Sequence, residues 1–208
     1  MNINYQLARF VASYAKPEQV PASVRPEVSF VGRSNVGKSS IMNKIFRRKD
    51  LVKVGATPGK TRAINFFNVG DVDFVDLPGY GYAKRSKAEQ GAWKPLVEGY
   101  FSQNRRFALC VLLVDIRHDA SPLDLRMIEF LQLQEIPFML VFTKADKLGA
   151  NAKRKQVGAL SRQLAAAGDA VVVPASSLSG EGIDDVRSLI QDAVNQSRSA
   201  IPSDDSQE

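Results

Sequence analysis

The fold of this chain is decided by the stretch Gly32-Arg33-Ser34-Asn35-Val36-Gly37-Lys38-Ser39, which fits the phosphate-loop pattern G-x-x-x-x-G-K-[ST]. Before it, residues 28–31 form a short apolar run that is typical of a buried strand. After it, residues 40–46 place apolar side chains at helical spacing. A strand, a loop and a helix in this order are the context that the pattern requires, so the stretch predicts a phosphate-binding loop.

The polar groups of this loop predict how it holds a nucleoside triphosphate and Mg²⁺. Its two glycines let backbone N–H groups turn toward phosphate oxygens, Lys38 reaches the β- and γ-phosphates as a catalytic residue, and the Ser39 hydroxyl ligates the metal. The candidate nucleotide-binding residues of the loop are Gly32, Arg33, Ser34, Asn35, Val36, Gly37, Lys38, Ser39 and Ser40.

A second motif predicts that the base is guanine. Thr143, Lys144, Ala145 and Asp146 follow the apolar run 137–142 and read T-K-x-D at the end of a strand. The carboxylate of Asp146 can accept hydrogen bonds from both N1–H and the N2 amine of guanine, while the stem of Lys144 lies along the ring. Adenine offers no such pair of donors, so the motif indicates GTP or GDP.

A third contact to the base is expected from Ala175, Ser176 and Ser177, which follow the strand-like residues 170–173. Their backbone N–H groups could meet the guanine O6. Many small GTPases carry Ser-Ala at the two central places, and Ser177 stands here for the alanine. We expect this difference to be tolerated because the contact is made mainly by the backbone.

Two further segments are expected to sense the γ-phosphate. In Asp76-Leu77-Pro78-Gly79, which reads D-x-x-G, Asp76 would hold Mg²⁺ through a water and Gly79 would donate its N–H to the γ-phosphate as a catalytic residue. Upstream, the hydroxyl of Thr61 could complete the Mg²⁺ shell, and we count it as a metal ligand and catalytic residue. The candidate nucleotide-binding residues of this second segment are Gly59, Lys60, Thr61, Arg62 and Ala63.

Together these five motifs resemble the TRAFAC-class GTPases, and their details resemble the EngB (YihA/YsxC) family of bacterial GTPases over about residues 25–195. The loop 79–84, with its two tyrosines, carries the resemblance most specifically, together with 57–61 and 65–67. The resemblance implies a slow GTPase that acts as a switch in assembly of the large ribosomal subunit and is needed for normal cell division and septation. Residues 1–25 and 197–208 lack strong periodicity, so we expect an N-terminal extension (1–25) that could pack on the domain, one EngB-type G domain (26–196) and a flexible C-terminal tail (197–208).

Hydrolysis is expected to be slow because Tyr80 occupies the place after D-x-x-G where Ras-like proteins carry a water-orienting Gln. Asn35 stands where potassium-activated relatives use an asparagine oxygen, so K⁺ could supply the missing charge stabilisation. Asn is also an ordinary turn residue, which leaves this open. Arg62 and Arg85 are further candidates for the missing group.

The pattern of elements predicts an α/β, three-layer P-loop GTPase (Ras-like) fold. Strand-like runs alternate with helix-like runs, which indicates a mostly parallel six-stranded sheet with helices on both faces and one antiparallel edge hairpin. The expected strands are 28–32, 64–69, 71–76, 107–115, 137–142 and 170–174, and the expected helices are 38–47, 88–103, 122–134, 151–167 and 183–195. All five motifs then fall at the carboxyl ends of the strands, where such sheets bind ligands.

Composition limits the kind of protein this is. A chain of 208 residues with 44% hydrophobic residues suits one domain, and its single cysteine, Cys110, lies in an apolar run and is expected to be a buried thiol. We find no signal peptide, lipidation signal or membrane-spanning run, so we expect a cytoplasmic monomer that does not bind membranes.

The charge distribution points to RNA as a partner. Residues 1–106 carry 18 Lys/Arg against 8 Asp/Glu, a net charge of +10, whereas residues 107–208 carry 10 against 14, a net charge of −4. The basic half holds both switch segments, and Tyr80, Tyr82 and Trp93 lie among its cations. Such a mixture favours rRNA of the large-subunit precursor, and we expect no DNA partner.

Three other classes of protein compete with this interpretation. A membrane-remodelling GTPase is disfavoured because the sequence has neither an amphipathic anchor nor a lipidation signal. A P-loop metabolic kinase is disfavoured by T-K-x-D. A guanine-nucleotide-binding scaffold for septation, which acts through a protein partner without ribosome contact, remains compatible with the missing Gln.

Overall fold

The fold is built on one seven-stranded sheet with strand order β1-β3-β4-β2-β5-β6-β7. The structure, a computed structural model, describes residues 2–53, 63–81 and 93–199, with the side chains of Trp93 and Lys94 left out of the description. Its strands are β1 (Arg9–Tyr14), β2 (Glu27–Gly32), β3 (Ile64–Val69), β4 (Val72–Asp76), β5 (Phe107–Asp115), β6 (Phe138–Thr143) and β7 (Val172–Pro174). Its α-helices are α1 (Lys38–Ile45), α3 (Trp93–Phe101), α4 (Pro122–Leu133), α5 (Ala150–Gln163) and α6 (Ile183–Ser199).

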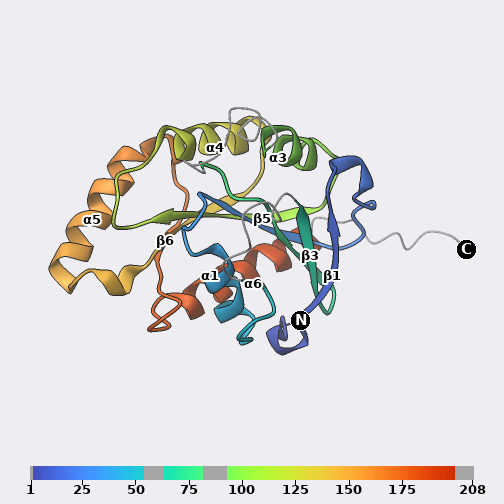
Figure 1. Cartoon of the computed structure of the whole chain (residues 1–208), viewed down its shortest axis with the longest axis horizontal. Coiled ribbons are helices and arrows are strands. Elements are labelled where there is room, and N and C mark those ends of the chain that lie inside the picture. Colours follow the sequence, from blue (N-terminus) through green and yellow to red (C-terminus); the bar gives the residue numbers. More distant parts are fainter. Residues whose placement is uncertain (1, 54–62, 82–92, 200–208) are drawn as a thin grey trace, which may run out of the picture.

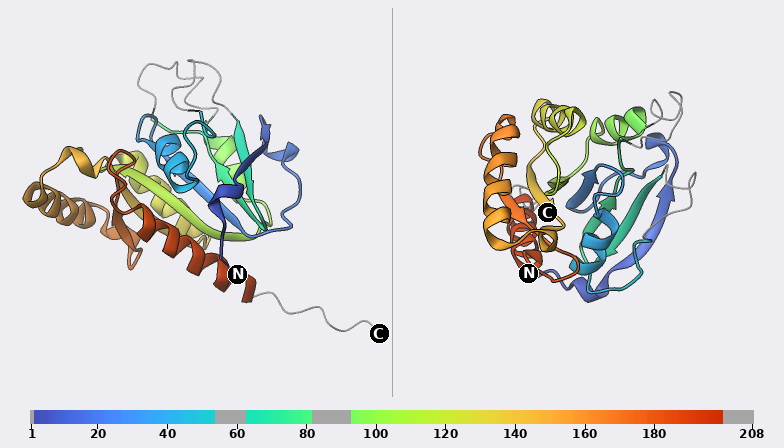
Figure 2. Two further views of the ribbon diagram at one scale, coloured as in Figure 1. Left: turned by 90° about the horizontal axis from the view of Figure 1, so that it is seen from below. Right: turned by 60° about the vertical axis from the view of Figure 1, so that its left-hand side comes forward.

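Helices cover both faces of the sheet, which confirms the predicted three-layer architecture (Figures 1 and 2). The apolar sides of α1 and α6 pack on one face, where Phe30, Ile41 and Ile190 are fully buried. The apolar sides of α3, α4 and α5 pack on the other face, around residues such as Leu112 and Ile128. Because the sheet is covered on both sides, every residue of β2 is buried, and β5 and β6 are apolar at nearly every position.

The central strands run parallel and bring their carboxyl ends to one edge. β2 pairs in parallel with β4 and β5, β5 with β6, and β6 with β7. This edge therefore collects the residues that follow β2, β4, β5, β6 and β7. It is the edge at which the predicted motifs were expected to meet.

The sheet has one strand more than the six that were predicted. β1, inside the segment predicted as an N-terminal extension, pairs antiparallel with β3 and carries a register shift between Phe10 and Ala12. The β3–β4 hairpin is formed as expected, but it is not at the edge of the sheet because β1 covers it. The sequence did not indicate β1, since its residues are mostly exposed and lack a clear alternation of apolar and polar side chains.

The helix boundaries differ from the predictions mainly at their ends. α6 continues to Ser199, so the first residues of the predicted tail are helical, while residues 200–208 lie outside the description. Within the described residues the other helices end before the predicted residue, and α5 begins one residue earlier than predicted, because the hydrophobic period predicts the middle of a helix better than its ends. The first residues of the predicted helix 88–103 lie outside the described residues. Within the described residues, no helix is long and apolar enough to cross a membrane.

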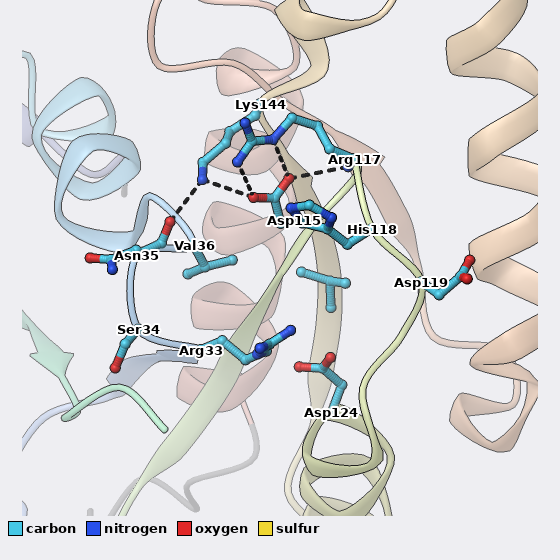
Figure 3. A pocket seen from close by; sticks show the side chains of 11 residues that line it. Arg33, Ser34, Asn35, Val36, Asp115, Arg117, His118, Asp119, Asp124 and Lys144 are labelled. Atoms are coloured by element: carbon cyan, nitrogen blue, oxygen red, sulfur yellow. Dashed lines mark hydrogen bonds and ion pairs between the residues drawn. The ribbon is translucent and has the colours of Figure 1, made fainter. Parts of the chain in front are cut away.

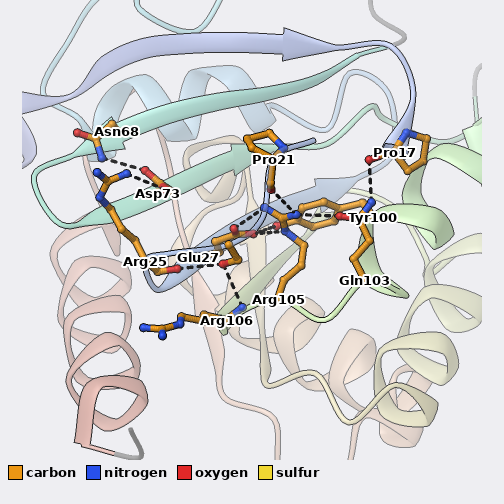
Figure 4. A network of polar contacts seen from close by, with 11 residues as sticks. Pro17, Pro21, Arg25, Glu27, Asn68, Asp73, Tyr100, Gln103, Arg105 and Arg106 are labelled. Atoms are coloured by element: carbon orange, nitrogen blue, oxygen red, sulfur yellow. Dashed lines mark hydrogen bonds and ion pairs between the residues drawn. The ribbon is translucent and has the colours of Figure 1, made fainter. Parts of the chain in front are cut away.

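A buried polar network fixes the amino-terminal end of the central strand β2, opposite the predicted site (Figure 4). The carboxylate of Glu27 accepts two hydrogen bonds from Arg105, at 2.9 and 2.7 Å, and one from the Tyr100 hydroxyl at 2.7 Å. Arg105 also donates to the carbonyl of Pro21 at 3.0 Å, and Gln103 donates to the carbonyl of Pro17 at 2.7 Å. The network joins β2, α3 and the N-terminal segment.

Candidate functional site

The phosphate loop is the turn between β2 and α1. Gly32 ends β2 so close to β5 that a Cβ atom there would lie 2.7 Å from the carbonyl oxygen of Leu113. Gly37 precedes α1 with φ of 101°, in the left-handed region that favours glycine. The backbone therefore requires glycine at both positions of the motif. α1 begins at Lys38, as predicted, so Lys38 and Ser39 lie in its first turn.

Lys38 and Asp76, from two different motifs, form an ion pair with each other. The carboxylate of Asp76 also accepts a hydrogen bond from Asn65 Nδ2 at 3.3 Å, and Asn65 Oδ1 accepts one from the Ser13 hydroxyl at 2.5 Å. Polar contacts thus run from β1 through β3 and β4 to the phosphate loop. Ser39 and Asp76 supply the oxygen donors that Mg²⁺ prefers, so these residues fit the metal that the motifs imply.

The D-x-x-G segment lies directly against the phosphate loop. The N–H of Tyr80 donates to the carbonyl of Gly32 at 3.2 Å, and the N–H of Ser34 donates to the carbonyl of Tyr80 at 2.8 Å. A Cβ atom on Gly79 would lie 3.1 Å from the nitrogen of Ser34, so a larger residue would press on the loop. The backbone of each segment therefore restricts where the other can lie.

The side chain of Tyr80 is buried rather than displayed to the site. It is 2% exposed, and its hydroxyl donates a 2.6 Å hydrogen bond to Asp124 of α4. The other oxygen of Asp124 accepts hydrogen bonds from the N–H and hydroxyl of Ser121, the N-cap of α4, at 2.8 and 2.7 Å. Burial, followed by the charge of Asp124, raises the pKa of Tyr80 well above its usual value. Tyr80 thus joins the D-x-x-G segment to α4.

The predicted guanine motif is tied to the phosphate loop through two of its side chains. The hydroxyl of Thr143 donates to the carbonyl of Val36 at 2.6 Å, and Lys144 Nζ donates to the carbonyl of Asn35 at 2.8 Å. Lys144 itself adopts φ of 63°, which directs the chain into the short turn that holds Asp146.

The third predicted base contact lies beside this motif. The Ser176 hydroxyl donates to Asp146 Oδ1 at 2.6 Å, and it accepts hydrogen bonds from the N–H groups of Leu178 and Ser179, both at 3.1 Å. The N–H of Ala145 donates to the carbonyl of Ala175 at 3.1 Å. Because its hydroxyl orients the carboxylate, Ser176 has a role beyond the backbone contact that the sequence suggested.

The sequence did not single out Asp115, the last residue of β5, although it lies at the centre of a polar cluster at this edge (Figure 3). Its carboxylate accepts hydrogen bonds from Lys144 Nζ at 2.8 Å and from Arg117 Nε and Nη2 at 2.9 and 2.8 Å. Burial alone would raise the pKa of this carboxyl, but the hydrogen bonds from Arg117 and Lys144 outweigh burial and lower it. Its position at the end of an apolar run is the signal that could have identified it.

A pocket of about 200 Å³ opens between the phosphate loop and the segment after β5. Arg33, Asn35, Asp115, His118 and Lys144 are among the residues that line it (Figure 3). The pocket is continuous with the cluster around Asp115. Lys144 connects this cluster to the phosphate loop, because its Nζ donates both to Asp115 and to the carbonyl of Asn35.

Some predicted residues lie outside the description and remain predictions. They are Gly59, Lys60, Thr61 and Arg62, including the second predicted Mg²⁺ ligand, together with Arg85. Ala63 is described and is half-buried immediately before β3. Leu77 and Pro78 are buried between Asp76 and Gly79. Ser40 and Ser177 are partly exposed.

A phosphate loop, a D-x-x-G segment and a T-K-x-D turn on adjacent strand ends of a three-layer sheet define the class of P-loop GTPases. A family model described as "50S ribosome-binding GTPase" matches residues 27–144. A curated relative from Exiguobacterium sibiricum, "Probable GTP-binding protein EngB", is 46% identical over 178 residues, which cover 85% of this chain and 92% of the relative. This chain belongs to the EngB family, whose members bind and hydrolyse GTP.

Solved structures share the fold. A crystal structure of a probable GTP-binding protein EngB superimposes with a TM-score of 0.67 at 24% identity, covering 82% of this chain and 99% of that one. A structure of Era in complex with MgGDPNP and a segment of 16S ribosomal RNA superimposes with a TM-score of 0.62 at 22% identity. It covers 82% of this chain and 57% of Era.

Proposed function

We propose that this GTPase is a Mg²⁺-dependent switch that binds rRNA in the large ribosomal subunit precursor and assists its assembly. The observation that carries the proposal is the match of residues 27–144 to a family described as ribosome-binding. The net charge of +10 on residues 1–106, which hold both switch segments, supports RNA as the partner. Era, a protein of the same fold, was crystallised with ribosomal RNA.

The geometry supports a nucleotide-dependent change at the D-x-x-G segment. Tyr80 and the phosphate loop exchange two backbone hydrogen bonds, and Asp76 pairs with Lys38. With nucleotide bound, Lys38 would contact the β- and γ-phosphates and Asp76 would hold Mg²⁺ through a water, so both side chains of the ion pair would gain new partners. The segment that begins at Gly79 then changes with the γ-phosphate, and the affinity for rRNA changes with it.

Hydrolysis by the chain alone is proposed to be slow. The side chain of Tyr80 is held by Asp124 and cannot orient the attacking water as a Gln does. K⁺ bound at Asn35 would supply positive charge between the β- and γ-phosphates. The exposed left-handed position of Asn35, with φ of 64°, is equally suited to a turn residue, so potassium activation needs its own measurement in K⁺ and Na⁺.

The proposal is tested by co-sedimentation with purified large ribosomal subunits in GDP and in a non-hydrolysable GTP analogue, with Lys38→Ala as control. We expect binding that depends on the triphosphate and is lost in the control. Equal sedimentation in both nucleotides would refute the switch. No sedimentation in either would remove the ribosome from the proposal.

The role in cell division and septation is proposed to follow from this activity, because a cell short of ribosomes divides late. The alternative is a scaffold that uses GTP to bind a protein partner of the septum. That alternative predicts normal ribosomal subunit profiles when the protein is depleted, whereas ribosome assembly predicts an accumulated large-subunit precursor before division is affected.

A further inference from the structure

We propose that single-stranded RNA binds a surface formed by the loop after α1 and by one residue of β1, at the carboxyl end of α1 and therefore at the other end of this helix from the phosphate loop. This surface, here called the α1-end surface, consists of Phe10, Arg47, Arg48, Lys49 and Lys53. The inference rests on the proposed function in taking rRNA as the natural ligand, and it names the residues that bind it.

Four exposed cations lie within seven residues of the chain at this surface. Arg47, Arg48, Lys49 and Lys53 are all exposed, and Asp50 is the one acidic residue among residues 47–53. In the described part of the chain none of the four forms an ion pair. Their charge is therefore available to phosphates, and each phosphate contact releases condensed counterions.

Hydrogen bonds from α1 and α6 fix the loop that carries these cations. Asn43, a buried residue of α1, donates to the carbonyl of Val52 at 2.6 Å and accepts from the N–H of Val52 at 2.8 Å. Arg187 of α6 donates to the carbonyl of Lys44 at 2.6 Å and to the carbonyl of Ile45 at 2.9 and 3.0 Å. These hydrogen bonds satisfy two carbonyl groups at the carboxyl end of α1. A loop fixed at both ends loses little conformational entropy when it binds.

Phe10 adds an exposed aromatic ring on β1, on the side of the sheet that packs against the end of α1. It is 51% exposed, and its ring lies 5.7 Å from Phe67, which in turn lies 5.8 Å from Phe46, the residue before Arg47. Arg48 also reaches the N-terminal segment, where it donates to the carbonyl of Gln6 at 3.5 Å. The ring of Phe67 therefore connects Phe10 to Phe46, and the hydrogen bond from Arg48 connects the basic loop to the segment before β1, although 37 to 43 residues separate Phe10 from the cations in the sequence.

Cations beside a half-exposed aromatic ring are the combination by which proteins bind unpaired nucleotides, with phosphates on the cations and a base stacked on the ring. A lipid surface is the other anionic candidate. Peripheral membrane binding typically uses an amphipathic helix, whereas Phe10 lies on a strand. The observations thus favour RNA.

The surface also adjoins the nucleotide switch in the sequence. Lys53 is the last described residue before the predicted segment 59–63, which carries Thr61. RNA bound at this loop would lie only a few residues along the chain from the segment that is predicted to sense GTP. We therefore expect the affinity of the protein for RNA to depend on the bound nucleotide.

The test uses the full chain and a fluorescein-labelled oligouridine of about twelve nucleotides, a length within the site sizes of such surfaces. The variant Arg48→Gln/Lys49→Gln is compared with Arg154→Gln/Lys155→Gln, which removes the same charge from exposed neighbours on α5 (Figure 1). We expect the first pair to weaken binding about tenfold or more and to reduce the salt slope of log K by about 1.4, the value for two phosphates. The α5 pair should change affinity less than about twofold.

A second comparison tests the aromatic contact. Phe10→Leu keeps an apolar side chain on Phe67 but removes the stacking face, and we expect about tenfold weaker binding. Phe10→Tyr keeps the face and should bind like the original chain. A merely structural role for Phe10 would make the two variants differ in unfolding midpoint rather than in RNA affinity.

Each outcome decides the inference. Equal loss in the two charge pairs, or no binding of oligouridine by the original chain, would overturn it. Binding to vesicles of anionic phospholipid that requires Arg48 and Lys49 while RNA binding does not would assign the surface to lipid instead. Binding of oligouridine through this surface without binding to large ribosomal subunits would support it and refute the proposed function alone.

Discussion

At the scale of single residues, Tyr80 shows how a departure from the usual GTPase pattern is accommodated. The residue that would face the attacking water is instead buried against α4, with its hydroxyl on Asp124. Its side chain contributes to the structure around the D-x-x-G segment, and its backbone maintains the contact with the phosphate loop.

Replacement of Tyr80 by Phe removes the hydroxyl and leaves one oxygen of a buried carboxylate without its donor. We expect the free energy of unfolding to fall by about 1.5–3 kcal/mol, as for a buried hydrogen bond to a charged group. Urea denaturation measures it. Tyr14→Phe, in a partly exposed ring that packs on Phe66, is the control and should change stability by less than about 0.5 kcal/mol. Equal effects of the two substitutions would contradict this account.

Asp115 is expected to act on nucleotide binding through Lys144. Asp115→Asn removes the charge that holds Lys144 Nζ beside the phosphate loop. We expect affinity for GDP to fall about tenfold, the loss typical of part of one charge-assisted hydrogen bond. Isothermal titration calorimetry checks this. Asp119→Asn is the matched control, since Asp119 lines the same pocket but bonds Gln163 at 2.8 Å. An unchanged affinity in Asp115→Asn would exclude the role.

At the scale of elements, strand β1 and the network at Glu27 decide how the N-terminal segment joins the domain. β1 protects the β3–β4 hairpin from being an open edge, and Ser13 connects it to Asn65 and Asp76. The network at Glu27 fixes the amino-terminal end of β2, which is the end away from the phosphate loop. It also orients α3, the helix that follows the second switch segment in the sequence.

Glu27→Gln should therefore be strongly destabilising. Arg105 has a side chain that is 2% exposed, so the substitution leaves a buried guanidinium without its counter-charge. We expect the free energy of unfolding to fall by about 3–5 kcal/mol. Thermal or urea denaturation measures this loss. Adding Arg105→Met should recover part of the loss, because the second change removes the uncompensated charge. If the double variant is less stable than Glu27→Gln, the cost lies in packing and the explanation fails.

At the scale of the whole molecule, buried acids that hold their protons predict sensitivity to alkali. Burial raises the pKa of Cys110 to about 12, and burial together with Glu27 raises the pKa of Tyr100 well above its usual value, as burial and Asp124 do for Tyr80. In the unfolded chain these groups lose protons near pH 9 and 10, while the folded chain keeps them. The unfolded state then binds fewer protons, so stability falls as pH rises.

We expect the free energy of unfolding, measured by urea denaturation, to be nearly constant from about pH 7 to 8.5 and to decline above about pH 9, with a slope approaching 1.4 kcal/mol per pH unit for each group. In Cys110→Ala the onset should move to about pH 10, where the tyrosines of the unfolded chain titrate. A midpoint that stays constant to pH 11 would show that these groups are solvated in the folded protein.

The sequence by itself determined the layers of the fold and the positions of the motifs that predict the nucleotide site. The phosphate loop, D-x-x-G and T-K-x-D have fixed spacings because backbone groups must surround a ligand of fixed shape, and each follows an apolar strand of the central sheet. Local chemistry therefore sufficed to place Gly32, Lys38, Asp76 and Asp146 at one edge.

Only the tertiary structure decided the contacts between segments far apart in the chain. Strand β1 has little hydrophobic pattern of its own and exists because it pairs with β3. Asp115, Asp124 and Glu27 are ordinary acids in the sequence, and their importance comes from the partners that folding brings to them. The same reason applies to Phe10 and the basic loop. The hydrophobic period of a sequence shows which face of an element is buried, but only the packing of the whole chain decides which other element lies against that face.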